Sequence, residues 1–131
     1  MGLLKDKVAV VTGVGSGIGK AISNAFADEG ACLGIGDINE DLLSKTVEEL
    51  NNKSSQVKSL KTDVSDEEQV KKLIDETVNT FGKLDIIVNN VSVAIGGYPI
   101  TDMSNDDWQK IIGINFSSVF YGCKHSIPYL K

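Results

Sequence analysis

The fold of this 131-residue chain is decided near its start, at residues 8–19, which read VAVVTGVGSGIG. Residues 8–12 are apolar and mostly β-branched, which is typical of a strand buried on both faces of a parallel sheet. Apolar residues from Ile18 to Phe26 recur at helical spacing. The glycines therefore lie between a strand and a helix, and the stretch predicts the start of a βα unit.

The alternation of strand and helix continues along the chain. Further strands are expected at residues 31–37, 57–62 and 84–88, with helices between them and after Ser104. This order predicts an α/β fold, a three-layer doubly wound parallel sheet of about four strands with helices on both faces. No linker or repeat interrupts it, so residues 1–131 are expected to form one domain.

Polar residues and glycines mark the expected helix boundaries. Asn39 and Ser104 are expected to cap the helices that follow them. Ser65 and Glu68 have the spacing of a capping box, and Gly82 is expected to end that helix.

Composition excludes several classes of function. The thirteen basic residues are all lysine and the formal net charge is −5, so neither nucleic acid nor an anionic membrane surface is an expected partner. The two cysteines form no CxxC pair and the single histidine has no ligand cluster around it, so no metal site is expected. No signal peptide and no membrane-spanning run are evident, which favours a cytoplasmic protein.

The glycine turn at residues 12–19 has the chemistry of a pyrophosphate site. Glycines let an anion approach the backbone closely, and the helix that follows offers free N–H groups and the positive end of its dipole. A P-loop is the competing phosphate site, but Val14 and Ala21 stand where it needs Gly and Ser or Thr. A purely structural turn is the other alternative.

Asp37 stands at the end of the second expected strand, 18 residues after Gly19. A carboxylate there can accept both ribose hydroxyls of an adenosine and would repel the 2′-phosphate of NADP. Because the chain has no arginine and no lysine directly after Asp37, NAD is favoured over NADP. Alternatively, Asp37 only caps the turn.

Four motifs in register resemble the short-chain dehydrogenase/reductase family. Thr12-Gly13-x-x-x-Gly17-x-Gly19 is similar to the family's TGxxxGxG pattern, and Asp63-Val64 to its Asp-Val pair near the adenine. Asn89-Asn90 is similar to the start of its Asn-Asn-Ala-Gly element, and Asn115 to the helix Asn of its catalytic tetrad. The resemblance extends over nearly the whole chain.

This resemblance implies a Rossmann-like domain and nicotinamide-dependent hydride transfer between the cofactor and a small-molecule alcohol or carbonyl substrate. It implies Asn115 as a catalytic residue, in support of a proton-relay water. The implied cofactor contacts are Gly13, Ser16, Gly17, Ile18, Gly19, Asp37, Ile38, Asp63, Val64, Asn89 and Asn90.

Two departures from the family pattern shape the functional expectation. Val91-Ser92 replaces the family's Ala-Gly, which predicts a narrower passage beside the cofactor or a shifted loop. The family's catalytic Ser, Tyr and Lys lie beyond the last residue, and the sequence has no Tyr-x-x-x-Lys pattern. We therefore expect the cofactor-binding half of an oxidoreductase, a domain truncated on its C-terminal side, without the family's remaining strands and with its fourth strand at an open edge.

A non-catalytic module is the alternative function, one that binds a dinucleotide or pairs with other subunits. The family implies oligomers, and the helix over residues 105–127 is the expected interface of a homo-oligomer. Trp108 and Tyr121 lie on this helix and are expected in the core or at an interface.

Overall fold

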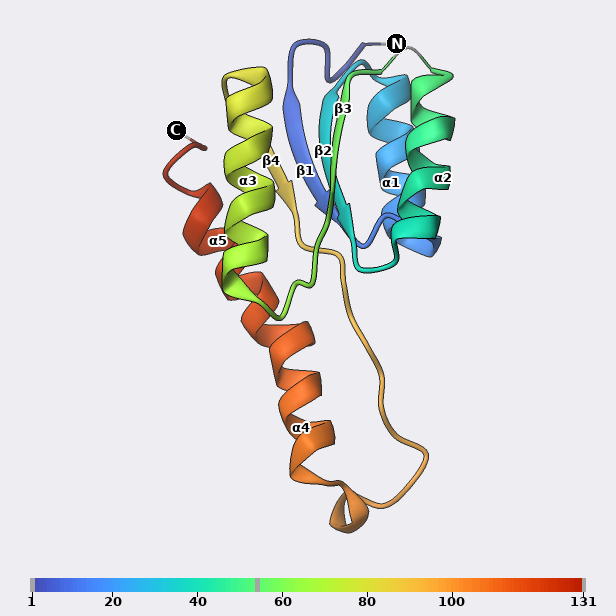
Figure 1. The fold of residues 1–131 in the computed structure, drawn as a ribbon, viewed down its shortest axis with the longest axis vertical. Coiled ribbons are helices and arrows are strands. Elements are labelled where there is room, and N and C mark those ends of the chain that lie inside the picture. Colours follow the sequence, from blue (N-terminus) through green and yellow to red (C-terminus); the bar gives the residue numbers. More distant parts are fainter. Residues whose placement is uncertain (1, 54, 131) are drawn as a thin grey trace.

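A computed structural model of the chain describes residues 2–53 and 55–130; positions 1, 54 and 131 lie outside the described residues. It consists of one parallel sheet with helices on both faces (Figure 1). The strands are β1 (Val8–Thr12), β2 (Cys32–Asp37), β3 (Val57–Lys61) and β4 (Ile86–Val88). The main helices are α1 (Gly17–Asp28), α2 (Glu40–Asn51), α3 (Glu67–Phe81), α4 (Asn105–Ile112) and α5 (Ser118–Ser126).

The strand order is β3-β2-β1-β4, and every neighbouring pair is parallel. This order confirms the predicted doubly wound sheet. β1 pairs with β2 on one side and with β4 on the other, and all five of its residues are buried. The strand predicted from the opening stretch is therefore the centre of the sheet, and β4 is at one edge of the described sheet, as expected.

Two apolar clusters hold the helices against the sheet. Helices α1 and α2 cover one face, while α3 and α5 cover the other (Figure 1). Leu33, Ile35 and Leu50 are fully buried in the first cluster, and Leu73 and Ile74 in the second. Burial of each such side chain contributes about 1.5–3 kcal/mol to folding.

Two of the three predicted N-cap residues cap their helices in the structure. The side chain of Asn39 accepts from Leu42 N, and that of Ser104 accepts from Asp107 N. The predicted capping box at Ser65 is wrong. The Ser65 hydroxyl instead donates to the Asp63 carboxylate at 2.6 Å. The N-cap of α3 is Asp66, whose side chain accepts from Glu68 N.

The strand and helix limits also differ in places from the expected ranges. β3 ends at Lys61 and β4 begins only at Ile86, because the ladder to β1 pairs residues 86–88 alone. The last helix, expected over residues 105–127, contains a π-helical turn at Gly113–Ser117 between α4 and α5. Such wide turns are frequent at functional sites.

The two aromatic residues expected in the core or at an interface differ in burial. Tyr121 packs against the cluster under α3. Trp108 is 48% exposed, so it is not a core residue. Helix α4 extends past the C-terminal ends of the strands, where little of the molecule can cover it (Figure 1).

Polar contacts tie α5 to α3. Glu67, in the first turn of α3, accepts from Lys124 at 2.5 Å and lies 2.9 Å from His125 Nε2. The hydrogen bond from Lys124, and then the one from His125, hold the pKa of the Glu67 carboxyl below its usual 4.5. Farther along α3, Asp75 accepts from the Tyr129 hydroxyl at 3.0 Å. These contacts fasten the C-terminal end of α5 and the residues after it to α3.

No helix in the ranges 2–53 and 55–130 combines the length and the apolar character that a membrane crossing requires.

Helix α3 approaches the sheet closely because β2 contains Gly34. A Cβ at Gly34 would overlap the buried Thr77 side chain, whose hydroxyl donates to Leu73 O at 2.7 Å. Gly34→Ala should therefore lower the free energy of unfolding by about 1–3 kcal/mol, the usual cost of overpacking. Urea denaturation followed by circular dichroism measures the change.

Gly96→Ala is the matched control. Gly96 lies in the loop after β4 with nothing within 4 Å of its missing Cβ, so its replacement should change stability by less than about 0.5 kcal/mol. Equal stabilities of the two variants would contradict the close contact between β2 and α3.

Candidate functional site

Because all strands are parallel, the segments that leave β1, β2 and β4 meet at the C-terminal edge of the sheet. The turn after β1 is held there by backbone bonds from Gly13 N to Gly36 O, at 2.8 Å, and from Val14 N to the same oxygen, at 3.4 Å. Val14 is fully buried, and its carbonyl accepts from Thr46 Oγ1 at 3.0 Å. The glycine turn is therefore fixed before any ligand arrives.

The three glycines of the motif, Gly13, Gly17 and Gly19, have different surroundings. A Cβ at Gly19 would overlap the carbonyl of Gly13. Gly13 has φ +70°, and Asn90 and Val91 press on the place of its missing Cβ. Gly17 has φ +58° and nothing within 4 Å of that place. Of the three, Gly17 is the one with open space above its backbone, where an anion can approach.

The start of α1 differs from the starts of α2, α3 and α4. Those three helices have side-chain caps and acidic residues in their first turns. Ser16 precedes α1 in an extended conformation and makes no side-chain cap, and the first turn of α1 contains no acidic residue. The first N–H groups of this helix therefore receive no side-chain oxygen from the cap position, and its dipole favours an anion.

Asp37 lies at the end of β2, directly beside the glycine turn. Its Oδ2 accepts from Gly15 N at 2.8 Å, and its Oδ1 accepts from Asn39 N at 2.9 Å. An ionised carboxylate offers about four lone-pair positions, so it can accept two further donors. Asp37 does shape the turn, as the structural alternative holds, and it keeps the capacity to bind a diol.

Gly15 is a residue of this site that sequence reasoning missed. A Cβ at Gly15 would lie 2.9 Å from both Asp37 Oδ2 and Leu42 Cβ, so only glycine lets the turn approach the carboxylate. The family pattern leaves this position free, and only the contact with Asp37 reveals its role.

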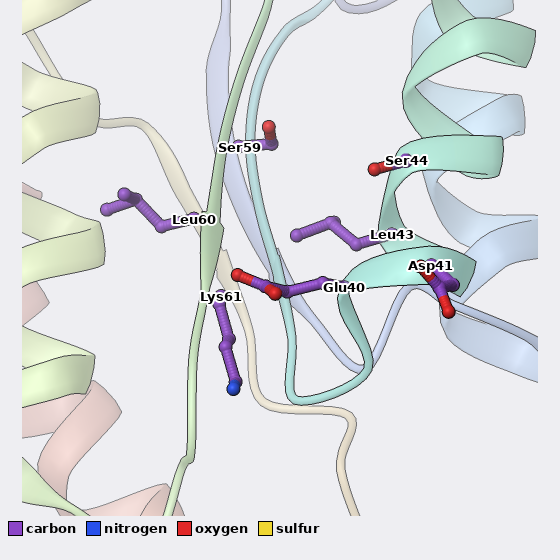
Figure 2. Close-up of a pocket in the computed structure, with 7 residues that line it drawn as sticks. All are labelled: Glu40, Asp41, Leu43, Ser44, Ser59, Leu60 and Lys61. Carbon is purple, nitrogen blue, oxygen red and sulfur yellow. The ribbon is translucent and has the colours of Figure 1, made fainter.

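Strand pairing also brings a lysine to Asp37. Lys61 is the register partner of Asp37 on β3, and it is exposed. Figure 2 shows Lys61 and Glu40 at one end of a groove of about 450 Å³ between α2 and β3, with Ser44 and Ser59 farther along it. No lysine directly follows Asp37 in sequence, but the pairing of β2 with β3 places one opposite it in the sheet.

Two hollows adjoin the turn. The first, of about 130 Å³, is largely apolar, and its lining residues are Gly13, Asp37, Ile38, Thr62, Asp63, Val64, Val91, Val93 and Ile114. The second, of about 320 Å³, is a more open groove, and its lining residues are Gly13, Ser16, Ile18, Asp37, Asn90, Val91 and Ser92. They share Gly13, Asp37 and Val91, so the two hollows are adjacent and together form a candidate site for a dinucleotide.

Most of the predicted cofactor residues meet at these hollows. Gly17 and Gly19 form the backbone of the turn beside the groove. Thr62, Val93 and Ile114 were missed, because they join the site through the ends of β3, the loop after β4 and the π-helical turn. No sequence pattern distinguishes them from ordinary apolar or strand-end residues.

Asn90 locks the turn to β4. Its Nδ2 donates to the carbonyls of Thr12 and Gly13, at 3.1 and 3.2 Å, and its backbone N donates to Thr12 Oγ1 at 3.1 Å. The Asn90 side chain is thus committed to the backbone, although the residue lines the groove.

Asn89 and Asn115 lie outside the linings of both hollows. Asn89 packs against Gly122 on α5, and its Nδ2 lies 3.9 Å from Cys123 Sγ. Asn115 binds the backbone of Val93 twice, since its Oδ1 accepts from Val93 N and its Nδ2 donates to Val93 O, both at 2.7 Å. Asn115 therefore fastens the loop after β4 to the π-helical turn.

Comparison with known proteins agrees with this geometry. The family model described as short chain dehydrogenase matches residues 7–131. A 3beta-hydroxysteroid dehydrogenase 2 of Eggerthella lenta is 37% identical over 97% of this chain and 49% of its own length.

Solved structures give the same result. A short-chain dehydrogenase/reductase from Burkholderia phymatum, in complex with NAD, has a TM-score of 0.94 and 35% identity over 99% of this chain and 46% of that one. A carveol dehydrogenase from Mycobacterium avium, also in complex with NAD, has a TM-score of 0.94 and 27% identity over 99% of this chain and 51% of that one.

The chain spans about half the length of these relatives. Within that span the strand order, the glycine turn and the helices of both faces are present. The chain belongs to the short-chain dehydrogenase/reductase family of oxidoreductases.

Proposed function

We propose that these residues bind NAD and form the cofactor-binding half of an oxidoreductase that transfers hydride between a nicotinamide and an alcohol or carbonyl substrate. The observation that carries the proposal is the uncapped start of α1, with open space over Gly17, next to the Asp37 carboxylate and an apolar hollow. This arrangement offers N–H donors for a pyrophosphate, an acceptor for a ribose diol and an apolar recess for an adenine.

Each part of the site has a distinct task in this proposal. The backbone at Gly17 and Ser16 binds the pyrophosphate, and Asp37 binds the adenosine ribose. The recess lined by Ile38, Asp63 and Val64 receives the adenine. The nicotinamide would supply hydride chemistry when bound, while the residues named here hold the adenosine and pyrophosphate parts of the cofactor.

Asn115 acts in this proposal as a positioning residue. Both polar atoms of its side chain are used by Val93, so it orients the loop that borders the apolar hollow. The sequence contains no Tyr-x-x-x-Lys pattern. We therefore assign cofactor binding, and not proton transfer to the substrate, to these residues.

A second candidate function is subunit pairing, which one specific observation favours. Three large apolar side chains are exposed along the last helix. Phe116 in the π-helical turn is 74% exposed, and Phe120 in α5 and Ile127 directly after α5 are each 58% exposed. Exposed apolar side chains that lie close together along a helix are typical of protein–protein interfaces. We propose that a second copy of the chain covers them.

The choice between NAD and NADP tests the proposed cofactor. Calorimetric titration of the chain should show tighter binding of NAD than of NADP, because the Asp37 carboxylate repels a 2′-phosphate. Asp37→Asn removes this charge and should reduce the discrimination about tenfold or more. Lys61→Met, which removes the cation opposite Asp37, should weaken NADP binding alone. Tighter binding of NADP by the unaltered chain would refute the preference.

Gly17→Ala tests the pyrophosphate site. The added Cβ enters the open space over the turn, so NAD should bind about tenfold more weakly or worse, since hydrogen bonds to a charged group contribute about 1.5–3 kcal/mol each. Gly82→Ala is the matched control, because Gly82 also has a positive φ (+85°) and no atom within 4 Å, but lies at the end of α3. Both variants pay a similar backbone cost, of about 1–2 kcal/mol. Equal NAD affinities for the two variants would place the pyrophosphate elsewhere.

Subunit pairing is tested by sedimentation equilibrium. The unaltered chain should form dimers, and Phe120→Asp should shift it to monomers, because a charge would be buried in the interface. Leu3→Asp is the control, since Leu3 is 81% exposed and its backbone N donates to the Glu29 side chain at the end of α1, away from α5. A monomeric unaltered chain would rule out pairing through this surface.

A further inference from the structure

Val91 stands at the boundary between the two hollows of the site. It follows β4 directly after Asn89 and Asn90, and it is one of the three residues that line both hollows. The other two are Gly13 in the glycine turn and Asp37 at the end of β2. A dinucleotide that fills both hollows must therefore pass Val91.

The Val91 side chain occupies the space over Gly13. Its Cγ2 lies 2.9 Å, and its Cα 3.6 Å, from the position that a Cβ of Gly13 would take. Gly17, by contrast, has nothing within 4 Å of the same position. The glycine turn is therefore open at Gly17 and covered at Gly13, and the cover is an isopropyl group.

This cover is rigid. Val91 is β-branched, which restricts its side chain to few rotamers, and it packs against the apolar cluster under α3. The residue before it, Asn90, is held by three hydrogen bonds to Thr12 and Gly13. A ligand cannot move Val91 aside without disturbing either the cluster or the end of β1.

We propose that Val91 is an affinity-limiting residue of the cofactor site, a wedge that keeps a dinucleotide from lying against the backbone of Gly13. The inference rests on the proposed binding of NAD. It predicts that the wedge opposes ligands that cross from one hollow to the other, and does not oppose ligands confined to the apolar hollow.

Val91→Ala tests the wedge by calorimetry with three probes: NAD, ADP-ribose and adenosine. The variant should bind NAD and ADP-ribose about five- to tenfold more tightly, because relief of an overpacked contact is worth at least about a factor of five. Adenosine, which does not extend across Gly13, should gain no affinity. Val91→Ile, which adds bulk at the same place, should weaken NAD and ADP-ribose and serves if the alanine variant fails to fold.

Val93→Ala is the matched control. Val93 lines the apolar hollow and not the groove, so its truncation should weaken all three probes to a similar degree through lost apolar contact. The ratio of NAD to adenosine affinity should then change in the Val91 variants and stay constant in the Val93 variant.

The outcomes separate the wedge from the proposed function. If the unaltered chain binds NAD and Val91→Ala binds it equally or more weakly, the wedge is refuted while cofactor binding stands. If adenosine gains as much affinity as NAD, Val91 acts on the adenine recess and the wedge is again refuted. If neither the unaltered chain nor any variant binds NAD or ADP-ribose, the proposed function itself fails, and the wedge falls with it.

Discussion

Parallel pairing of β1 with β2 on one side and β4 on the other is the constraint on which the rest of the structure depends. The register aligns Thr12 with Gly36 and Val11 with Val88, so the three strands end at nearly one level. The segments that leave these strands must then share a small volume at one edge of the sheet. Polar groups from distant parts of the sequence become neighbours there without any ligand to gather them.

Side-chain and backbone hydrogen bonds turn this neighbourhood into a rigid frame. Asn90 binds the end of β1, and Asp37 binds the glycine turn at Gly15. The site is thus preorganised, because its groups need not be ordered when a ligand binds. Some residues that a motif assigns to the cofactor consequently have a structural task as well, and Asn90 uses its side-chain Nδ2 for that task.

The sequence predicted the parts of the fold that depend on local pattern. The buried strand at residues 8–12, the caps at Asn39 and Ser104 and the end at Gly82 agree with the structure, because each depends on neighbours close in sequence. The capping box at Ser65 was wrong because two adjacent residues, Ser65 and Asp66, compete to cap one helix. The nearby Asp63 engages Ser65 and decides the competition.

The remaining features depend on contacts between residues that are far apart in the sequence. Lys61 stands opposite Asp37 in the sheet only because β3 pairs with β2 in one register. Gly15 must be glycine because Asp37 lies beside it. The wide turn that contains Asn115 breaks a helix whose spacing gives no warning of it. Residues such as Val93 and Ile114 join the site from outside the motifs, and their types are those of any core residue.

The pair of bonds between Asn115 and the backbone of Val93 divides the long loop after β4 into two parts. The part before Val93 is held to the sheet by Asn90 and to the helix by Asn115. The part beyond, with Gly96 and Gly97, makes no close contact at its glycines. The outer part can therefore change in length and sequence without disturbing the cofactor groove. The inner part must keep its structure, and the outer part is free to vary among related proteins.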